Sequence, residues 1–215
     1  MDPIFKGKDL AGLELIETLR RDPDGGFPHL ALHLQRLQAS AARLGWHCDA
    51  QAVQDALAGL APAPGPRRVR MVLNAAGRIQ IRDAELPPNP PRWRLALAST
   101  RLDSADPWLG IKSSRRAVYD RARASLPAGI DELLFCNELD ELCEGTISNL
   151  FIRQNGRLLT PPLASGLLPG VLRRKLLESG AAAEAVLFAP DLQRAEAVYM
   201  GNSLRGLIPA ELPET

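Results

Sequence analysis

Cysteine is scarce in this 215-residue sequence, which has only Cys48, Cys136 and Cys143 and no pair spaced as CxxC. An odd count without close pairs argues against a disulfide framework and is typical of a reducing cytoplasm. Long apolar runs are lacking too: residues 1–6 show no apolar signal core, and no stretch is long enough to span a bilayer. We therefore expect a cytoplasmic protein that is neither secreted nor embedded in a membrane.

An excess of charge of one sign is also lacking. The sequence has 26 basic and 25 acidic residues, for a formal net charge of +1. Such a balance predicts no nucleic-acid partner, because polyanion-binding surfaces need clustered positive charge. Hydrophobic residues make up 46% of the chain and charged residues 24%, as in ordinary globular domains. The length is sufficient for one large domain or two small ones.

The pattern of the first half predicts a small α/β domain over residues 1–102. Apolar positions alternate over Leu13–Leu19, as in a strand, and recur at helical spacing over His29–Leu44. Gly45 is expected to end that helix, and Asp49 to cap a second one over residues 49–60. Further strands are predicted at residues 69–74, 78–82 and 93–99, the first two forming a hairpin.

The second half, residues 103–215, is predicted to form a larger, strand-rich domain. Strands are expected at residues 132–137, 146–153, 157–160, 185–188 and 197–200. Helices are expected at residues 114–125 and 171–179. This mixture is neither all-α nor all-β, so the fold class is α/β in the broad sense, with an α+β arrangement.

Five short motifs stand in order along the chain. They are His33-Leu34-Gln35-Arg36-Leu37, Ile111-Lys112, Glu144–Phe151, Thr160-Pro161-Pro162 with the later Gly166–Val171, and Gly201–Gly206. Together, from about residue 13 to residue 212, they resemble the class IV aminotransferase-type family of pyridoxal 5'-phosphate (PLP) proteins. The family includes branched-chain and D-amino-acid aminotransferases and 4-amino-4-deoxychorismate lyase. The resemblance implies a two-domain fold of type IV, with a small α/β domain and a larger pseudo-barrel, and a homodimer.

Lys112 and Glu144 are the residues that carry the expected chemistry. Lys112 follows the apolar Leu109-Gly110-Ile111, and a lysine in such a setting is the residue type that forms Schiff bases. The resemblance implies that Lys112 holds PLP covalently. It also implies that the carboxylate of Glu144 faces the pyridine nitrogen, where a negative charge favours the protonated, electron-poor ring.

The cofactor phosphate has a separate set of expected ligands. The resemblance gives this role to Arg36, whose planar fork of donors suits a phosphate. The predicted helix that opens after Gly170 offers free backbone N–H groups at Val171 and Leu172, and the resemblance adds the side chains of Asn202 and Ser203. A metal site at His29 and His33 lacks a third ligand, so we expect no metal and regard both histidines as structural.

The finer match favours the lyase over the aminotransferases. Residues 15–19, 39–45, 117–120 and 195–198 resemble lyases that accompany aminodeoxychorismate synthase. The implied reaction is a lyase step toward folate that converts 4-amino-4-deoxychorismate to 4-aminobenzoate and pyruvate. Arg115 and Arg116 are candidate substrate ligands, although the family often has asparagine where Arg115 stands.

Two alternatives to the lyase stay open. One is an amino-acid aminotransferase of the same fold, and the other is an idle PLP-binding partner of the synthase. The small domain begins close to the strand at residue 13, so it is expected to be N-terminally trimmed relative to full-length relatives.

Overall fold

The computed structural model describes residues 2, 4–5 and 10–213. The chain divides into two compact units, residues 1–88 with 111–115, and residues 89–110 with 116–215. The predicted single boundary after residue 102 differs from this division in two places. Residues 89–102 belong to the second unit, and the short segment 111–115 returns to the first. Among the described residues, no helix is long and apolar enough to cross a membrane.

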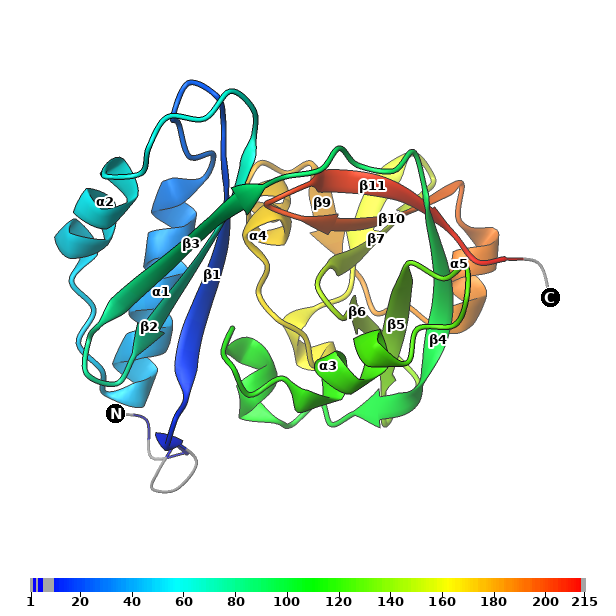
Figure 1. The fold of residues 1–215 in the computed structure, drawn as a ribbon. Helices are drawn as coiled ribbons and strands as arrows, with labels where there is room; N and C mark the ends of the chain where they lie inside the picture. Colours follow the sequence, from blue (N-terminus) through cyan, green and yellow to red (C-terminus); the bar gives the residue numbers. More distant parts are fainter. Residues whose placement is uncertain (1, 3, 6–9, 214–215) are drawn as a thin grey trace. The chain divides into compact units, whose positions relative to one another are not determined.

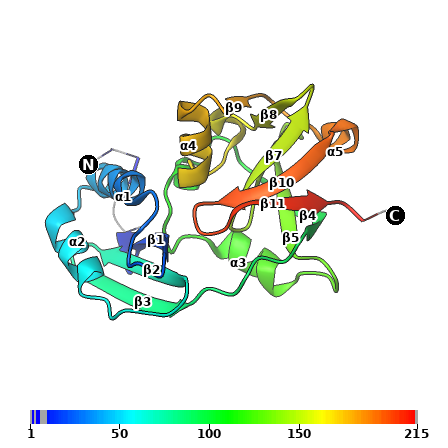
Figure 2. The same ribbon diagram turned by 90° about the horizontal axis from the view of Figure 1, so that it is seen from above.

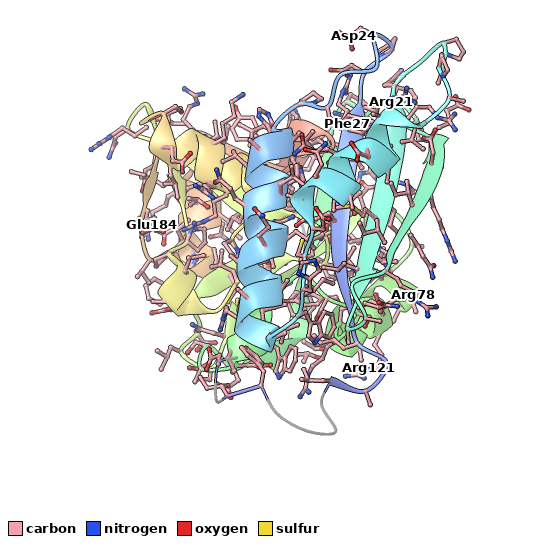
Figure 3. All side chains as sticks on the ribbon, turned by 90° about the vertical axis from the view of Figure 1, so that its left-hand side faces the viewer. Arg21, Asp24, Phe27, Arg78, Arg121 and Glu184 are labelled. Atoms are coloured by element: carbon pink, nitrogen blue, oxygen red, sulfur yellow. The ribbon has the colours of Figure 1, made fainter. Side chains whose placement is uncertain are left out.

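The first unit is a three-stranded antiparallel sheet with two helices across one face (Figures 1 and 3). Its elements are β1 (Glu14–Arg21), α1 (Leu30–Leu44), α2 (Ala50–Ala58), β2 (Arg67–Asn74) and β3 (Ile79–Glu85). As predicted, Gly45 ends α1 in a left-handed conformation, and the Asp49 side chain caps α2 through the N–H groups of Gln51 and Ala52. Arg21 and Phe27, labelled in Figure 3, form a cation–π contact of 6.0 Å.

The segment 111–115 lies along the free edge of β1. Ser113 forms an antiparallel bridge with Leu15, Ile16 N–H donates to Lys112 C=O at 2.8 Å, and Ser114 N–H donates to Glu14 C=O at 2.8 Å. Lys112 is therefore directly opposite Ile16, held by the backbone of β1.

The second unit is built on a closed ring of strands. Its elements are β4 (Trp93–Leu102), α3 (Ala117–Ala124), β5 (Glu132–Asn137), β6 (Leu142–Gly145), β7 (Asn149–Gln154), β8 (Arg157–Thr160), α4 (Val171–Glu178), β9 (Ala182–Glu184), α5 (Ala189–Arg194), β10 (Ala197–Asn202) and β11 (Gly206–Glu211). The sheet runs β10-β11-β4-β5-β6-β7-β8-β9, and β10 also pairs with β7. This last pairing, visible in Figure 2, closes β4, β5, β6, β7, β10 and β11 into a barrel.

Side-chain alternation gives the barrel two apolar layers. One core cluster takes residues from all six barrel strands, among them Leu134 and Cys136 of β5, and fills the interior. The alternate residues of β5, Leu133 and Phe135, pack outside the barrel against α3 and its flanking loop. All six residues of β5 are buried because both of its faces are covered. The predicted fold class, a small α/β domain followed by a larger pseudo-barrel, is confirmed.

Several element predictions were wrong for identifiable reasons. Helix α3 begins at Ala117 rather than residue 114, because Ser113 and Ser114 pair with β1. The strand predicted at residues 146–153 begins only at residue 149, as β7, because residues 146–148 form a tight turn in which Gly145 N–H donates to Ser148 C=O at 2.7 Å. The strand before this turn, β6, was not predicted.

The remaining errors lie near the C-terminus. The strand predicted at residues 185–188 does not form, since β9 spans residues 182–184. Helix α5 follows, with Asp191 accepting from Phe188 N–H at 2.8 Å, and β11 was not predicted.

Candidate active site

Glu144 lies in a row of residues that crosses three strands of the barrel. In the strand register it is opposite Asn149 of β7, which is opposite Gly201 of β10. Glu144 is buried, with 5% of its surface exposed. The row places the predicted acid two strands from Gly201, the residue before Asn202. The second unit therefore brings together two of the predicted site motifs that are 57 residues apart in the chain.

Side chains of the second unit contact the Glu144 carboxylate. Tyr119 Oη donates to Oε1 at 2.7 Å, and Asn149 Nδ2 lies 3.4 Å from Oε2. Asn149 Nδ2 also donates to the Leu168 carbonyl at 3.0 Å. Asn149 thereby links the acid to the loop that leads into α4.

The turn after Glu144 is held by a second, fully buried acid. Glu132 of β5 accepts hydrogen bonds from the N–H and hydroxyl of Thr146 and from the hydroxyl of Ser148. Arg123 lies 3.6 Å from the same carboxylate. A buried carboxylate with several donors and a cation is stably accommodated. Glu132 thus fixes the β6–β7 turn, which directly follows Glu144.

The start of α4 has the features of an anion site. Gly170 is its N-cap residue and supplies no side-chain cap. The first helical hydrogen bond is from Arg174 N–H to Gly170 C=O, at 2.9 Å. The N–H groups of Val171 and Leu172 precede that bond, so the helix itself gives them no acceptor, and the positive end of the helix dipole lies beside them.

Leu172 and Asn202 lie close to the same end of β10. A Cβ atom added at Gly201 would lie 3.0 Å from Leu172 Cδ2. The Asn202 side chain accepts from the N–H groups of Leu204 and Arg205 and donates to the Ile147 carbonyl at 3.3 Å. Asn202 therefore shapes the loop before β11, and Ser203 lies half-buried within that loop. Their contact with a phosphate stays a prediction.

In the first unit, Arg36 is held by a buried ion pair. Its Nε and Nη2 donate to the two carboxylate oxygens of Glu17, at 2.8 and 2.6 Å. His33 Nδ1 lies 2.6 Å from Glu17 Oε2, and the His33 side chain is fully buried. The structure thus gives His33 a supporting contact to the acid that orients Arg36. This bidentate geometry fixes the plane of the guanidinium group.

The charges of this cluster shift the pKa of Glu17. Burial by itself would raise that pKa, but the charge of Arg36 and the hydrogen bonds from His33 and Arg36 outweigh it and lower the pKa from 4.5 to about 2. The sequence motif at residues 15–19 did not predict that Glu17 pairs with Arg36. The available signal was its strand position between Leu15 and Leu19, which places it on the face that α1 covers.

Arg115 and Arg116, the candidate substrate ligands, belong to different units. Arg116 forms an ion pair with Asp120 at 2.8 Å, donates to the Thr146 carbonyl at 3.1 Å, and lies 5.8 Å from the Tyr119 ring centre. These contacts tie α3 to the β6–β7 turn. Arg115 is exposed, and its N–H donates to the Ser113 hydroxyl at 3.3 Å. A substrate role for either residue stays a prediction.

Comparison with known proteins agrees with this fold and motif set. A sequence model of the class IV aminotransferases matches residues 14–212. A Schizosaccharomyces pombe protein, provisionally named an aminodeoxychorismate lyase, is 31% identical over 192 residues, which cover 85% of this chain and 83% of that protein. The chain belongs to the class IV aminotransferase family.

Two solved structures show the same fold. A Mesorhizobium loti protein, provisionally named an amino-acid aminotransferase, is 45% identical with a TM-score of 0.86, covering 94% of this chain and all of that one. The 4-amino-4-deoxychorismate lyase of Pseudomonas aeruginosa is 27% identical with a TM-score of 0.78, covering 93% of this chain and 82% of that one. Proteins named as lyases and as aminotransferases therefore both share this fold, with the Mesorhizobium loti protein the more similar of the two.

The Glu17–Arg36 pair predicts a loss of stability in acid. Because the pKa of Glu17 is lowered, its contribution to the free energy of unfolding is present above pH 4.5 and is lost as the pH falls toward 2. Glu17→Gln should destabilise the protein by roughly 3 kcal/mol at pH 7, since Arg36 loses its buried partner. Urea unfolding at pH 7 and pH 3 measures both effects. Glu14→Gln, on the same strand, is the control, and an equal loss in both variants would contradict the prediction.

A methyl group at Gly170 should disturb the loop before α4. A Cβ atom there would lie 1.9 Å from Asn149 Oδ1, so the Asn149 side chain must move away from Leu168 and Glu144. Gly170→Ala is expected to cost about 2 kcal/mol in the free energy of unfolding. Gly65→Ala, where a Cβ atom meets nothing within 4 Å, is the matched control. Equal unfolding midpoints in urea for the two variants would show that Asn149 adapts without cost.

Proposed function

We propose that the protein is a PLP-dependent lyase that converts 4-amino-4-deoxychorismate to 4-aminobenzoate and pyruvate. The observation that carries this proposal is the 31% identity to a protein named as such a lyase, over 85% of the chain. The similarity to the Pseudomonas aeruginosa lyase supports it independently. We further propose a cytoplasmic homodimer that acts with an aminodeoxychorismate synthase in folate synthesis.

The residues present fit PLP. The second unit supplies a buried carboxylate, Glu144, for the pyridinium, and the uncapped start of α4 supplies N–H donors for a phosphate. Lys112, whose backbone is fixed to β1, would provide the covalent attachment, and Arg36 would be a further phosphate ligand. When bound, PLP would withdraw electrons from the carbon that bears the substrate's amino group.

Lys112 would then act as both base and acid. As the base, its amine removes the proton from the substrate carbon that bears nitrogen. The carbon–oxygen bond that joins the substrate's ring to its enolpyruvyl group would then break, and the substrate's ring would become aromatic. Lys112 then returns the proton to the departing enolpyruvate, which becomes pyruvate. Glu144 would keep a negative charge beside the pyridine nitrogen throughout.

One face of the first unit's sheet favours an anionic substrate. Side chains alternate across a sheet, so Lys112 and the opposite residue Ile16 are on the face that the helices do not cover. The same face carries Arg70 of β2 directly opposite Arg82 of β3, both exposed. Guanidinium groups bind carboxylates through their planar set of N–H donors, so this face suits an anion.

Aminodeoxychorismate has two carboxylates, whereas a branched-chain amino acid has one. The paired arginines on the face of Lys112 therefore favour the lyase substrate. The aminotransferase alternative is supported by the 45% identity to the Mesorhizobium loti protein. An aminotransferase would convert bound PLP to its amine form when given an amino acid and would release a 2-oxo acid.

The direct test is to incubate the PLP-loaded protein with aminodeoxychorismate and to follow 4-aminobenzoate by its fluorescence. Product should form with wild type, and Lys112→Ala should lower the rate by at least about a thousandfold. Borohydride reduction followed by peptide mass mapping should place the cofactor on Lys112. Lys175→Ala, at an exposed position on α4, is the control. Loaded wild type that makes no 4-aminobenzoate would exclude the lyase.

The arginine pair yields a separate expectation for the lyase reaction. Arg70→Gln and Arg82→Gln should each raise the KM for aminodeoxychorismate by roughly tenfold, with little change in kcat, because the carboxylate contact is made in the bound substrate as well as in the transition state. Arg78→Gln, at the exposed hairpin end labelled in Figure 3, is the control and should match wild type. If both variants also match wild type, these arginines do not bind the substrate.

A further inference from the structure

Tyr119 is a half-buried phenol whose hydroxyl donates to the carboxylate of Glu144. It lies on α3, seven residues after Lys112, and its Oη is 2.7 Å from Glu144 Oε1. Its ring packs edge-to-face on Phe135 of β5, with ring centres 5.3 Å apart and an interplanar angle of 78°. The Arg116 guanidinium lies against the same ring. These contacts leave the phenol little freedom to turn away from Glu144.

The surroundings of the phenol favour its protonated form, in which it donates to Glu144. Burial is the largest cause of this, and the charge of Glu144 and the shared hydrogen bond add to it, so the pKa of Tyr119 is raised far above its ordinary value of 10. A carboxylate is an acceptor only, so the bond has one direction, from Oη to Oε1. The hydrogen bond also orients the carboxylate, since Oε1 is held by Tyr119 while Asn149 approaches Oε2.

We infer that Tyr119 is a positioning residue that holds Glu144 for its interaction with the pyridine nitrogen of PLP. This inference rests on the proposed PLP chemistry, but not on which substrate the enzyme uses. A short hydrogen bond to an ionised group is among the stronger ones, and it favours the anionic form of the acceptor. Tyr119 therefore acts through Glu144, and the protonated state of the cofactor ring depends on it.

The role differs from one that touches the cofactor directly. A tyrosine that contacts only the phenolic oxygen of the cofactor would leave Glu144 unaffected when it is removed. A tyrosine that works through Glu144 would lose its effect once Glu144 itself is changed. A double-mutant cycle between the two positions separates these cases.

The test compares wild type, Tyr119→Phe, Glu144→Ala and the double variant, each loaded with PLP. Tyr119→Phe keeps the ring against Phe135 and removes only the hydroxyl. Its dissociation constant for PLP, measured by equilibrium dialysis, should rise roughly tenfold. The pH midpoint of the bound cofactor's absorbance should move to higher pH, because a less firmly protonated ring withdraws less charge from the Lys112 nitrogen. Neither change should follow when Tyr119→Phe is introduced into the Glu144→Ala variant.

The chain contains its own control, since Tyr199 is the second of its two tyrosines. Tyr199→Phe, on β10, should match wild type in PLP affinity and in the pH midpoint. Thermal unfolding of the PLP-free proteins should be similar for both phenylalanine variants. Should Tyr119→Phe fail to fold, Phe135→Leu provides the second variant, since it frees the Tyr119 ring and should shift the same midpoint upward.

Three outcomes would overturn the inference. The first is that Tyr119→Phe leaves both the PLP affinity and the pH midpoint of the cofactor's absorbance unchanged. The second is that removing the Tyr119 hydroxyl changes them equally in wild type and in Glu144→Ala. The third is that the wild-type protein does not bind PLP. Failure of the lyase proposal is distinguishable. A wild type that binds PLP on Lys112 but makes no 4-aminobenzoate excludes the lyase, while the affinity and midpoint measurements still decide the role of Tyr119.

Discussion

The pairing of β7 with β10 is the interaction on which the second unit depends. One edge of β7 pairs with β10, and its other edge pairs with β6 and β8. Closure leaves the barrel strands without a free edge. The apolar interior that it encloses takes side chains from strands early in the unit's sequence, such as β4, and from strands late in it, such as β11. The same pairing aligns Glu144, Asn149 and Gly201 in one row. The candidate site in this unit is therefore a direct product of barrel closure.

Each unit contains a buried acid that orients a neighbouring polar group. Glu17 and Glu132 are both almost completely buried, and each is surrounded by donors. Glu17 fixes the plane of Arg36, and Glu132 fixes the turn after Glu144. Neither needs to touch a ligand to matter. Each converts a flexible polar group into one with a defined orientation, and such preorganisation is what sites for charged cofactors require.

Much of the fold was predictable because its signals are local. Alternation identified β1, β2 and β3, the helical period identified α1 and α4, and the capping residues Gly45 and Asp49 marked helix ends. The errors have a common physical origin. Ser113 pairs with Leu15, nearly 100 residues away, and the β6–β7 turn is held by Glu132, which lies outside it. Interactions between distant segments override the local pattern, and no window of sequence contains them.

The candidate site residues were named from the sequence alone. Lys112, Glu144, Arg36 and the helix start after Gly170 were predicted from motifs that resemble those of a known family, and their roles stay predictions. The tertiary structure decided which partners surround them. Tyr119 reaches Glu144 only because α3 packs on β5, and Asn149 reaches Leu168 only because β7 passes beside the loop before α4. The amino-acid sequence specifies which chemical groups are present, whereas tertiary packing decides which of them are close enough to interact.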